Sequence, residues 1–540
     1  MNKMRKHQVY LSPAPKGLEK QYNTLFTSGA IEVLIELMLH FENRIEELYT
    51  LRLERKLKWR KTRELPKFRE VDFKSDWEVA PVNARLQNRH LDLGDVSPTD
   101  LKHFSSALKA RVQGIQVDFD DGHCPTWKNQ IAGHHNIYCV VNNEIPGVPK
   151  ISEAPILMFR PRAWNMIEHN MSINGKEVPG PIFDFGLLMF HFASKLSKYE
   201  SGPFFYLSKV EGASEAKLWN DIFIWTQSKL GIPYGTIKAC VLIENILSAF
   251  EMDQILYELR DHSVGLNCGV WDYAASIISK FGDDSSFVIP DRDKYVNFDR
   301  TFLKKYMDLV VRTCHKRQAH ATGGMAAKLI PIGSNHSQST RGQVIQEVLK
   351  SKLKEIQAGF DGFMIYDLGL VDDINNLWSQ YGGLGVNQIH NLGTREPITE
   401  SELLTLPIGE VTVEGLKKNI RVSILFIYNW LCGQGVFSLN DSIEDSATAE
   451  ISRSQIWQWI RHSALIQSQN EAVTREYVAK EASDIFKALL MQFGMDNPSR
   501  VKLSIALDIF LEIVNHREFP EFITTYLNDS FIFKKLQANL

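Results

Sequence analysis

The 540-residue chain lacks a strong net charge, a cysteine motif and a long apolar run. Its net charge of −3 gives no electrostatic reason to bind nucleic acid or an anionic membrane surface. None of its six cysteines forms a C-x-x-C pair, which argues against a zinc knot or a thioredoxin-like motif and favours a reducing compartment. No apolar run approaches the roughly 18 residues that span a bilayer, and no apolar segment follows the basic N-terminus as in a secretory signal. We therefore expect no nucleic-acid partner and no membrane association.

What the chain does have is a series of short apolar segments, most of them separated by helical patterns and each closed by polar residues. These segments cover residues 114–119, 155–159, 203–207, 239–243, 263–267, 319–322 and 361–366. Alternation of this kind predicts an α/β fold, a (β/α)8 TIM barrel, whose eighth strand the sequence does not place. A doubly wound open sheet is the alternative, but no G-x-G-x-x-G fingerprint follows the first strand.

Helical patterns without strands flank the predicted barrel on both sides. Apolar residues recur at three and four from Ala30 to about Arg63, and residues 64–110 are mixed and polar, which is typical of a connecting region. The basic run 52–61 indicates a solvated helix end, with a binding arm as the alternative. Four amphipathic segments follow the barrel, at 416–430, 447–463, 473–493 and 501–514. We therefore predict a helical region and lead-in over 1–85, a barrel over 86–394 and an all-α C-terminal domain over 395–540.

Two carboxylates stand at the ends of neighbouring predicted strands. Glu244 ends the segment 239–243, and Asp272 follows the glycine-bracketed loop that comes after the next strand. Ligands collect at the carboxyl ends of parallel strands, so both side chains are expected at the functional face. Two carboxylates beside a glycine loop suit a hard cation such as Mg²⁺ together with a small anion.

The stretch Arg260-Asp261-His262-Ser263-Val264-Gly265-Leu266-Asn267-Cys268-Gly269-Val270-Trp271-Asp272-Tyr273 resembles the signature of the malate synthase family. The likeness runs from about Leu86 to about His462 and departs from the family pattern at Ala274 and Ala275. It implies an enzyme of the shorter, monomeric type that condenses glyoxylate with acetyl-CoA and hydrolyses the product to malate and CoA. The metal it implies is Mg²⁺.

The resemblance also implies roles for single residues. Glu244 and Asp272 match the family's metal ligands, and the backbone amides of the loop that contains Gly269, Val270, Trp271 and Asp272 would hold the glyoxylate carboxylate. Arg160 matches the catalytic arginine of an Arg-Pro-Arg-Gly-Trp motif, in which Ala163 here replaces the glycine. If that glycine has a positive φ, alanine is mildly unfavourable there.

Asp118 and Asp120 match family residues that hold waters on the metal. If both lie on a strand, they face the same side. Asp120 is one methylene shorter than the family's glutamate. The resemblance makes Asp445 the base that removes the acetyl methyl proton. Read without the resemblance, Asp445 is an N-cap, since it directly precedes a helical run. As a base it would come from the C-terminal domain, so that domain would have to close onto the barrel.

The acetyl-CoA site is expected along Gly323, Gly324 and Met325, which match a Gly-Gly-Met-Ala-Ala motif. Asp367 and Leu368 replace the family's His-Pro pair at the same lip, where a carboxylate near phosphates is unfavourable, and Val436-Phe437-Ser438 replace Cys-Val-Pro. These departures keep two alternatives open. One is a related lyase or synthase that acts on another 2-oxo acid or acyl-CoA, and the other is a catalytically weak relative kept as a binding or interaction protein.

The last three residues, Ala538-Asn539-Leu540, resemble an atypical peroxisomal import signal. The sequence thus predicts a peroxisomal or glyoxysomal protein that an import receptor binds. A frayed terminus without meaning, in a cytoplasmic protein, is the alternative.

Overall fold

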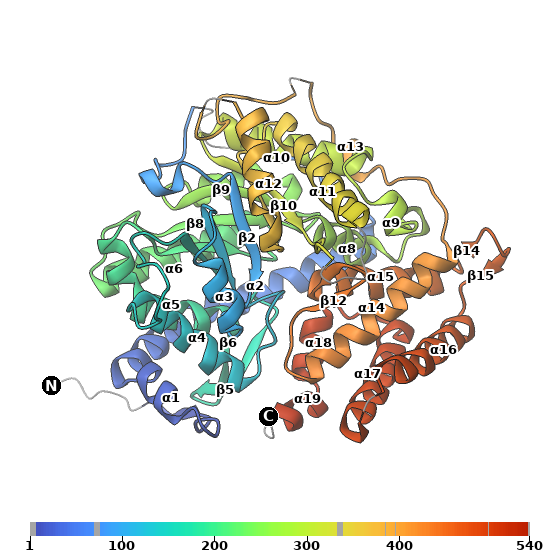
Figure 1. The fold of residues 1–540 in the computed structure, drawn as a ribbon, viewed down its shortest axis with the longest axis horizontal. Coiled ribbons are helices and arrows are strands. Elements are labelled where there is room, and N and C mark those ends of the chain that lie inside the picture. Colours follow the sequence, from blue (N-terminus) through green and yellow to red (C-terminus); the bar gives the residue numbers. More distant parts are fainter. Residues whose placement is uncertain are drawn as a thin grey trace.

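The structure is a computed structural model, and it describes residues 7–69, 76–331, 338–383, 385–394, 396–494 and 496–537. Figure 1 shows a barrel wrapped by helices, with a helical C-terminal domain in orange and red packed against one side of it. The predicted import signal at 538–540 lies outside the described residues.

Eight parallel strands close into a barrel in the order β10-β11-β2-β3-β4-β7-β8-β9, which confirms the TIM-barrel prediction. The strands are β2 (Leu91–Val96), β3 (Gly114–Asp118), β4 (Ile156–Arg160), β7 (Phe204–Leu207), β8 (Lys238–Ile243), β9 (Ser263–Cys268), β10 (His320–Ala326) and β11 (Gly362–Ile365). The helices that follow or cover them are α3 (Leu101–Ala107), α4 (Trp127–Val141), α5 (Gly180–Lys198), α6 (Ala213–Leu230), α7 (Met252–Glu258), α8 (Val270–Phe281), α10 (Thr301–Lys316), α11 (Gln338–Ala358) and α12 (Val371–Tyr381).

Strand β2 is the strand that the sequence did not place, and the interpretation of its residues as part of a connecting region is wrong. Its sequence, Leu-Asp-Leu-Gly-Asp-Val, looks like a turn, yet all six residues are buried. Asp92 is neutralised inside the barrel by Arg89 and also accepts a hydrogen bond from the Tyr206 hydroxyl (2.9 Å). Asp95, at the end of the strand, pairs with Arg160. The strand was missed because two of its buried residues are carboxylates with cationic partners, and these interrupt the apolar pattern that predicts a strand.

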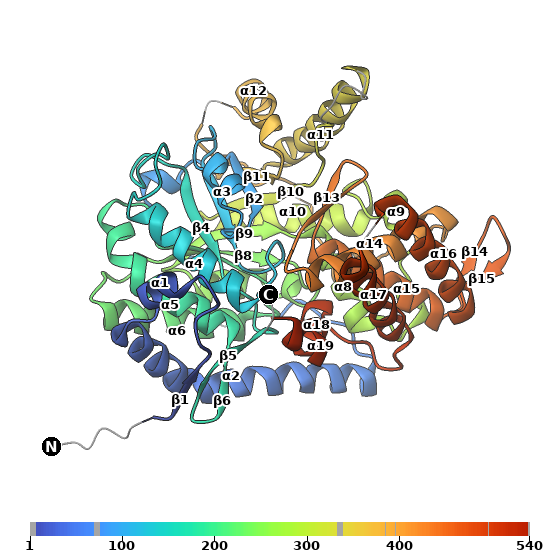
Figure 2. The ribbon, with the colours of Figure 1, turned by 60° about the horizontal axis from the view of Figure 1, so that its bottom comes forward.

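The N-terminal region contains the 35-residue α2 (Ser28–Thr62), as the periodicity predicted, and before it α1 (Glu19–Leu25), a short helix in the stretch that was expected to be a lead-in. A short strand, β1 (Val9–Leu11), adds to the hairpin of β5 (Ile167–Ile173) and β6 (Lys176–Pro179). Figure 2 shows α2 as a long blue helix along the lower edge of the view, passing beneath the barrel toward the C-terminal helices.

The basic end of α2 is solvated on one side, as expected, and forms ion pairs with the rest of the chain on the other. Arg52 forms an ion pair with Glu215 of α6, and Arg60 forms one with Glu518 of the C-terminal domain. Lys58 keeps a side chain that is 67% exposed.

The C-terminal domain has a hydrophobic core that is largely its own. Its main helices are α14 (Val413–Leu431), α15 (Ser446–Arg461), α16 (Arg475–Phe493), α17 (Asn497–Asn515), α18 (Ile523–Asp529) and α19 (Phe531–Gln537), and the first four confirm the predicted segments. The structure adds two short hairpins to this helical domain, β12 (Phe437–Leu439) with β13 (Ser442–Glu444), and β14 (Leu465–Ile466) with β15 (Glu471–Ala472).

The first of these hairpins ties the C-terminal domain to the barrel. The Ile443 amide donates to the Ala327 carbonyl (2.8 Å), and the Leu329 amide donates to the Asp441 carbonyl (2.8 Å), just beyond the end of β10. The chain that leads into α15 is therefore fixed over the carboxyl ends of the barrel strands.

Among the described helices, no single one is long and apolar enough to cross a membrane. Only α1 and α2 taken together, with a 58° bend between them, pass such a test.

Candidate active site

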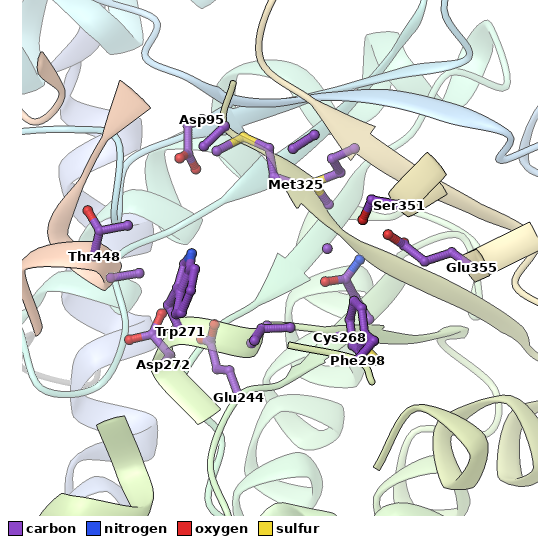
Figure 3. Close-up of a pocket in the computed structure, with 18 of the residues that line it drawn as sticks. Asp95, Glu244, Cys268, Trp271, Asp272, Phe298, Met325, Ser351, Glu355 and Thr448 are labelled. Atoms are coloured by element: carbon purple, nitrogen blue, oxygen red, sulfur yellow. The ribbon is translucent and has the colours of Figure 1, made fainter. Parts of the chain in front are cut away.

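Three buried carboxylates meet at the carboxyl end of the barrel. Asp121 lies in the loop after β3, Glu244 directly follows β8, and Asp272 lies in the first turn of α8. One oxygen from each lies within 4.8 Å of the others. Figure 3 shows Glu244 and Asp272 side by side, with Trp271 next to them. Gly269 makes room for this cluster, because a Cβ there would lie 2.8 Å from the Glu244 Cβ and 3.0 Å from its Oε2.

The cluster carries more negative charge than its protein surroundings neutralise. Burial raises the pKa of Glu244 to about 7 and raises that of Asp272 well above its ordinary value. Burial acts on Asp121 too, but Lys209 and Arg160 outweigh it and lower the pKa of Asp121 to about 2. A hard divalent cation fits this set of oxygens, because its positive charge stabilises the ionised form of carboxyls that burial disfavours.

Lys209 is the cation closest to these carboxylates, and the sequence analysis did not assign it a role. Its ammonium donates to Asp120 and to Asp121 (both 2.8 Å), and its backbone amide donates to Glu244 Oε1 (2.6 Å). Lys209 has a φ of +54°, in the left-handed region. A signal for it was present, because it comes two residues after the end of β7, where barrel enzymes place functional side chains.

Arg160 ends β4 and is held by three carboxylates. Its Nε and Nη2 donate to the two oxygens of Asp118 (2.7 and 2.6 Å), Nη2 also donates to Asp95 (2.7 Å), and Nη1 donates to Asp121 (3.0 Å). Burial would lower the pKa of Arg160, but these carboxylates hold it well above its ordinary value. The guanidinium is thus a permanently charged group with a fixed orientation.

The two residues expected to hold metal-bound waters lie next to the cluster rather than in it. Asp118 uses both oxygens on Arg160 and also accepts the amides of Asp120 and Gly122. Asp120 binds Lys209 and accepts the Ala163 amide (3.2 Å). Their contact with metal-bound water stays a prediction. Ala163 is not among the described residues with positive φ, so the expected cost of alanine there does not arise.

Asp445 is the N-cap of α15 and also reaches the site. Its Oδ1 accepts the Thr448 amide (2.9 Å), and the Thr448 hydroxyl accepts the Asp445 amide (3.0 Å), so the predicted cap is present. The next residue, Ser446, donates its hydroxyl to Asp121. Burial and the neighbouring Asp121 raise the pKa of Asp445. Burial and the neighbouring Asp445 raise the pKa of Asp95 well above its ordinary value.

A cavity of about 460 Å³ joins these groups. Its lining includes Asp95, Asp121, Arg160, Glu244, Gly269, Val270, Trp271, Asp272, Gly324, Met325 and Asp445. Most of the site residues named from the sequence therefore face one space between the barrel and the C-terminal domain. The amide of Gly269 is already bound by the Tyr306 hydroxyl (3.1 Å), whereas no side chain caps the start of α8 just after it.

Three residues predicted to contact acetyl-CoA are not in this lining. Gly323 packs so closely on Glu355 that a Cβ there would lie 1.8 Å from a carboxylate oxygen. Asp367 accepts hydrogen bonds from the amides of Gly369 (2.8 Å) and Ile330 (2.6 Å). It caps a short helical turn that begins at Leu368.

A second cavity, of about 1130 Å³, lies between the loops after β2 and β3 and the C-terminal domain. Its lining includes Gly122, next to Asp121, and residues 436–438, where the sequence differs from the family pattern. It also includes Arg421, whose Nε is buried without a hydrogen-bond partner among the described residues.

Comparisons with known proteins show which proteins this chain is similar to. Residues 156–406 match the family model "Malate synthase, TIM barrel domain", and residues 410–531 match "Malate synthase, C-terminal". A malate synthase of Myxococcus xanthus is 40% identical over 513 residues, which cover 93% of each chain. A malate synthase of Dictyostelium discoideum is 36% identical over 94% of this chain and 95% of that protein. A glyoxysomal malate synthase of Candida tropicalis is 34% identical over 94% of this chain and 93% of that protein.

Proposed function

Because this chain belongs to the malate synthase family, whose members condense glyoxylate with acetyl-CoA, we propose that its buried carboxylate cluster is the Mg²⁺ site of that reaction. Glu244 and Asp272 would be the ligands, with Asp121 as a third, bound directly or through water. The observation that carries this proposal is three buried carboxylates within 4.8 Å of one another. When bound, Mg²⁺ supplies Lewis-acid polarisation of the glyoxylate oxygens.

The start of α8 would hold the glyoxylate carboxylate. The amides of Val270, Trp271 and Asp272 are the first of the helix, where N–H groups have no intrahelical acceptors and the helix dipole favours an anion. Gly269 would shape this site rather than donate to it, because its own amide is bound to Tyr306. The aldehyde carbon would then lie in the 460 Å³ cavity, between Asp445 and Arg160.

Asp445 would remove a methyl proton from acetyl-CoA. Its raised pKa makes it a stronger base than an ordinary aspartate, which suits abstraction next to a thioester. Arg160, held in place by Asp118, would stabilise the enolate oxygen as charge develops on it. The enolate carbon then attacks the aldehyde, and hydrolysis of the thioester gives malate and CoA. The predicted need for a closed domain agrees with the hairpin contact that seats α15 on the barrel.

The acyl arm of CoA would pass Gly324 and Met325 and continue into the 1130 Å³ cavity. That cavity has room for a nucleotide and borders Asp121 through Gly122. Arg421 is a candidate for phosphate contact, since its Nε has no partner among the described residues. Gly323 would pack behind Gly324 and Met325, which would contact the acyl arm. Asp367 and Leu368 would form the edge of the acetyl-CoA site. There Asp367 is already satisfied by two amides, which lessens the expected conflict with phosphates.

The domain boundaries at 85/86 and 394/395 remain our proposal. The core of α2 is continuous with that of the barrel, whereas the C-terminal helices have a largely separate core. Limited proteolysis is therefore expected to cut near residue 395 before it cuts near residue 85.

We also propose peroxisomal or glyoxysomal import through Ala538-Asn539-Leu540, since the Candida tropicalis relative is described as glyoxysomal. A fluorescent fusion that exposes this tail should enter the organelle, and removal of the three residues should abolish entry. Cytoplasmic fluorescence of both forms would contradict the proposal.

Release of CoA thiol from acetyl-CoA tests the function itself. Release should require both glyoxylate and Mg²⁺, and malate should be the product. Activity with another 2-oxo acid or acyl-CoA, but not with this pair, would favour the related lyase or synthase instead.

A further inference from the structure

Arg52 of α2 contacts the active-site loop from outside the barrel. Its Nε and Nη2 donate to the two oxygens of Glu215 (both 2.8 Å), and Nη2 also donates to the backbone carbonyl of Lys209 (2.9 Å). The Arg52 side chain is only 10% exposed. Figure 2 shows how α2 passes along the barrel, which brings a residue of the N-terminal region to this loop.

Lys209 is the point at which this contact meets the carboxylate cluster. Its amide donates to Glu244, its ammonium donates to Asp121, and its carbonyl accepts from Arg52. All three contacts depend on one backbone conformation, and that conformation has a φ of +54°, which non-glycine residues seldom adopt. Surrounding contacts must hold such a residue in place.

The Arg52–Glu215 pair fixes this loop at two places. Arg52 holds the carbonyl of Lys209, and Glu215 Oε2 accepts the amide of Glu211 (3.1 Å). A planar guanidinium can make both contacts at once, because two of its nitrogens bind the Glu215 carboxylate while one of them also donates to the Lys209 carbonyl.

We propose that Arg52 is a positioning residue of the metal site. It keeps Lys209 in the left-handed conformation that directs the amide to Glu244 and the ammonium to Asp121, and so sets the spacing of the carboxylates before the cation binds. This inference rests on the proposed Mg²⁺ site. The competing explanation is that Arg52 only ties α2 to α6.

Another pair on the same two helices provides the control. Arg44 of α2 binds Asp221 of α6 (2.6 Å), and this ion pair does not involve the loop after β7. Substitutions R44Q and R52Q both remove an ion pair between α2 and α6. R52Q also removes the hydrogen bond to the Lys209 carbonyl, whereas R44Q leaves that bond in place.

The test is Mg²⁺ binding to the full-length protein by isothermal titration calorimetry, without substrates. Because loss of a group that orients metal ligands weakens metal binding by about 10–100-fold, R52Q should raise the Kd by that factor, while R44Q should leave it unchanged. R52K should give an intermediate Kd, because a lysine keeps a charge for Glu215 but lacks the fork. If R52Q does not fold, R52K carries the comparison.

A Kd for R52Q or R52K equal to that of R44Q would overturn the inference and leave Arg52 as a tie between helices. E244Q separates this failure from failure of the metal site itself. If E244Q binds Mg²⁺ as tightly as the unchanged protein, the proposed metal site is wrong, and the inference that Arg52 positions it is wrong as well.

Discussion

Asp445 has two roles in the structure that one pair of substitutions can separate. As an N-cap it uses Oδ1 to accept the Thr448 amide at 2.9 Å, and as the proposed base it uses its charge in the cavity. Asparagine keeps an Oδ1 acceptor and is as good an N-cap as aspartate, whereas alanine loses the cap. D445N should therefore remove the base alone, and D445A should remove both functions.

The two losses have different sizes. Positioned general bases contribute about 10²–10⁴ in rate, so D445N should lower kcat by that factor, about 3–5 kcal/mol of activation free energy. Its free energy of unfolding should not fall, because the cap is kept and a carboxyl whose ionisation is unfavourable there becomes neutral. D445A should lose as much activity and also about 1 kcal/mol of stability, the usual value of a cap.

Two assays read these effects separately. Release of CoA thiol measures turnover, and mass spectrometry of acetyl-CoA in D₂O, with Mg²⁺ and pyruvate in place of glyoxylate, measures exchange of the methyl protons. Urea unfolding measures stability. T448A is the control, because it removes the hydroxyl that accepts the Asp445 amide but keeps the carboxylate. It should be less stable and still exchange protons. Proton exchange by D445N at the rate of the unchanged protein would refute the assignment of the base.

Further predictions concern the metal site and the acetyl-CoA site. D121N should raise the Mg²⁺ Kd by about 10–100-fold, and D120N should raise it less, because Asp121 belongs to the carboxylate cluster and Asp120 lies on Lys209; calorimetry with the reverse order would contradict this geometry. G269A should also weaken Mg²⁺ binding, since the new Cβ would lie 2.8 Å from the Glu244 Cβ, and an unchanged Kd would show that the loop adapts. Burial raises the pKa of Glu244 to about 7 and that of Asp272 well above its ordinary value, so below pH 7 Mg²⁺ must displace protons and its Kd should rise by at least about tenfold per pH unit. A Kd that does not change between pH 6 and 8 would exclude this linkage. R421Q should raise the KM for acetyl-CoA with little change in kcat, and an unchanged KM would remove Arg421 from the phosphate site.

The sequence was informative wherever function depends on residues close together in the chain. The order of apolar segments predicted the barrel, and carboxylates at strand ends marked Glu244 and Asp272, because parallel strands bring their carboxyl ends to one face. Strand β2 escaped detection because Asp92 and Asp95 are buried against cations, and no local pattern reveals such partners.

Tertiary structure alone decided which groups share the site. Asp118 and Asp120 were assigned from the family resemblance and expected on one face of a strand, yet the strand ends at Asp118 and the loop after it brings Asp121 into the carboxylate cluster. The position of Lys209 just after a strand marked it as a possible site residue, but its partners Asp120, Asp121 and Glu244 follow only from the tertiary structure.

The sequence by itself thus determined the fold class, the family and the kinds of side chain available for catalysis, because these depend on local pattern and composition. The partner of each side chain depends on contacts between distant segments. The link from Arg52 to Lys209 joins residues 157 positions apart, and Asp445 reaches the barrel through contacts of its domain that include the hairpin of β12 and β13. Such distances are set by packing of the whole chain, and no stretch of sequence contains them.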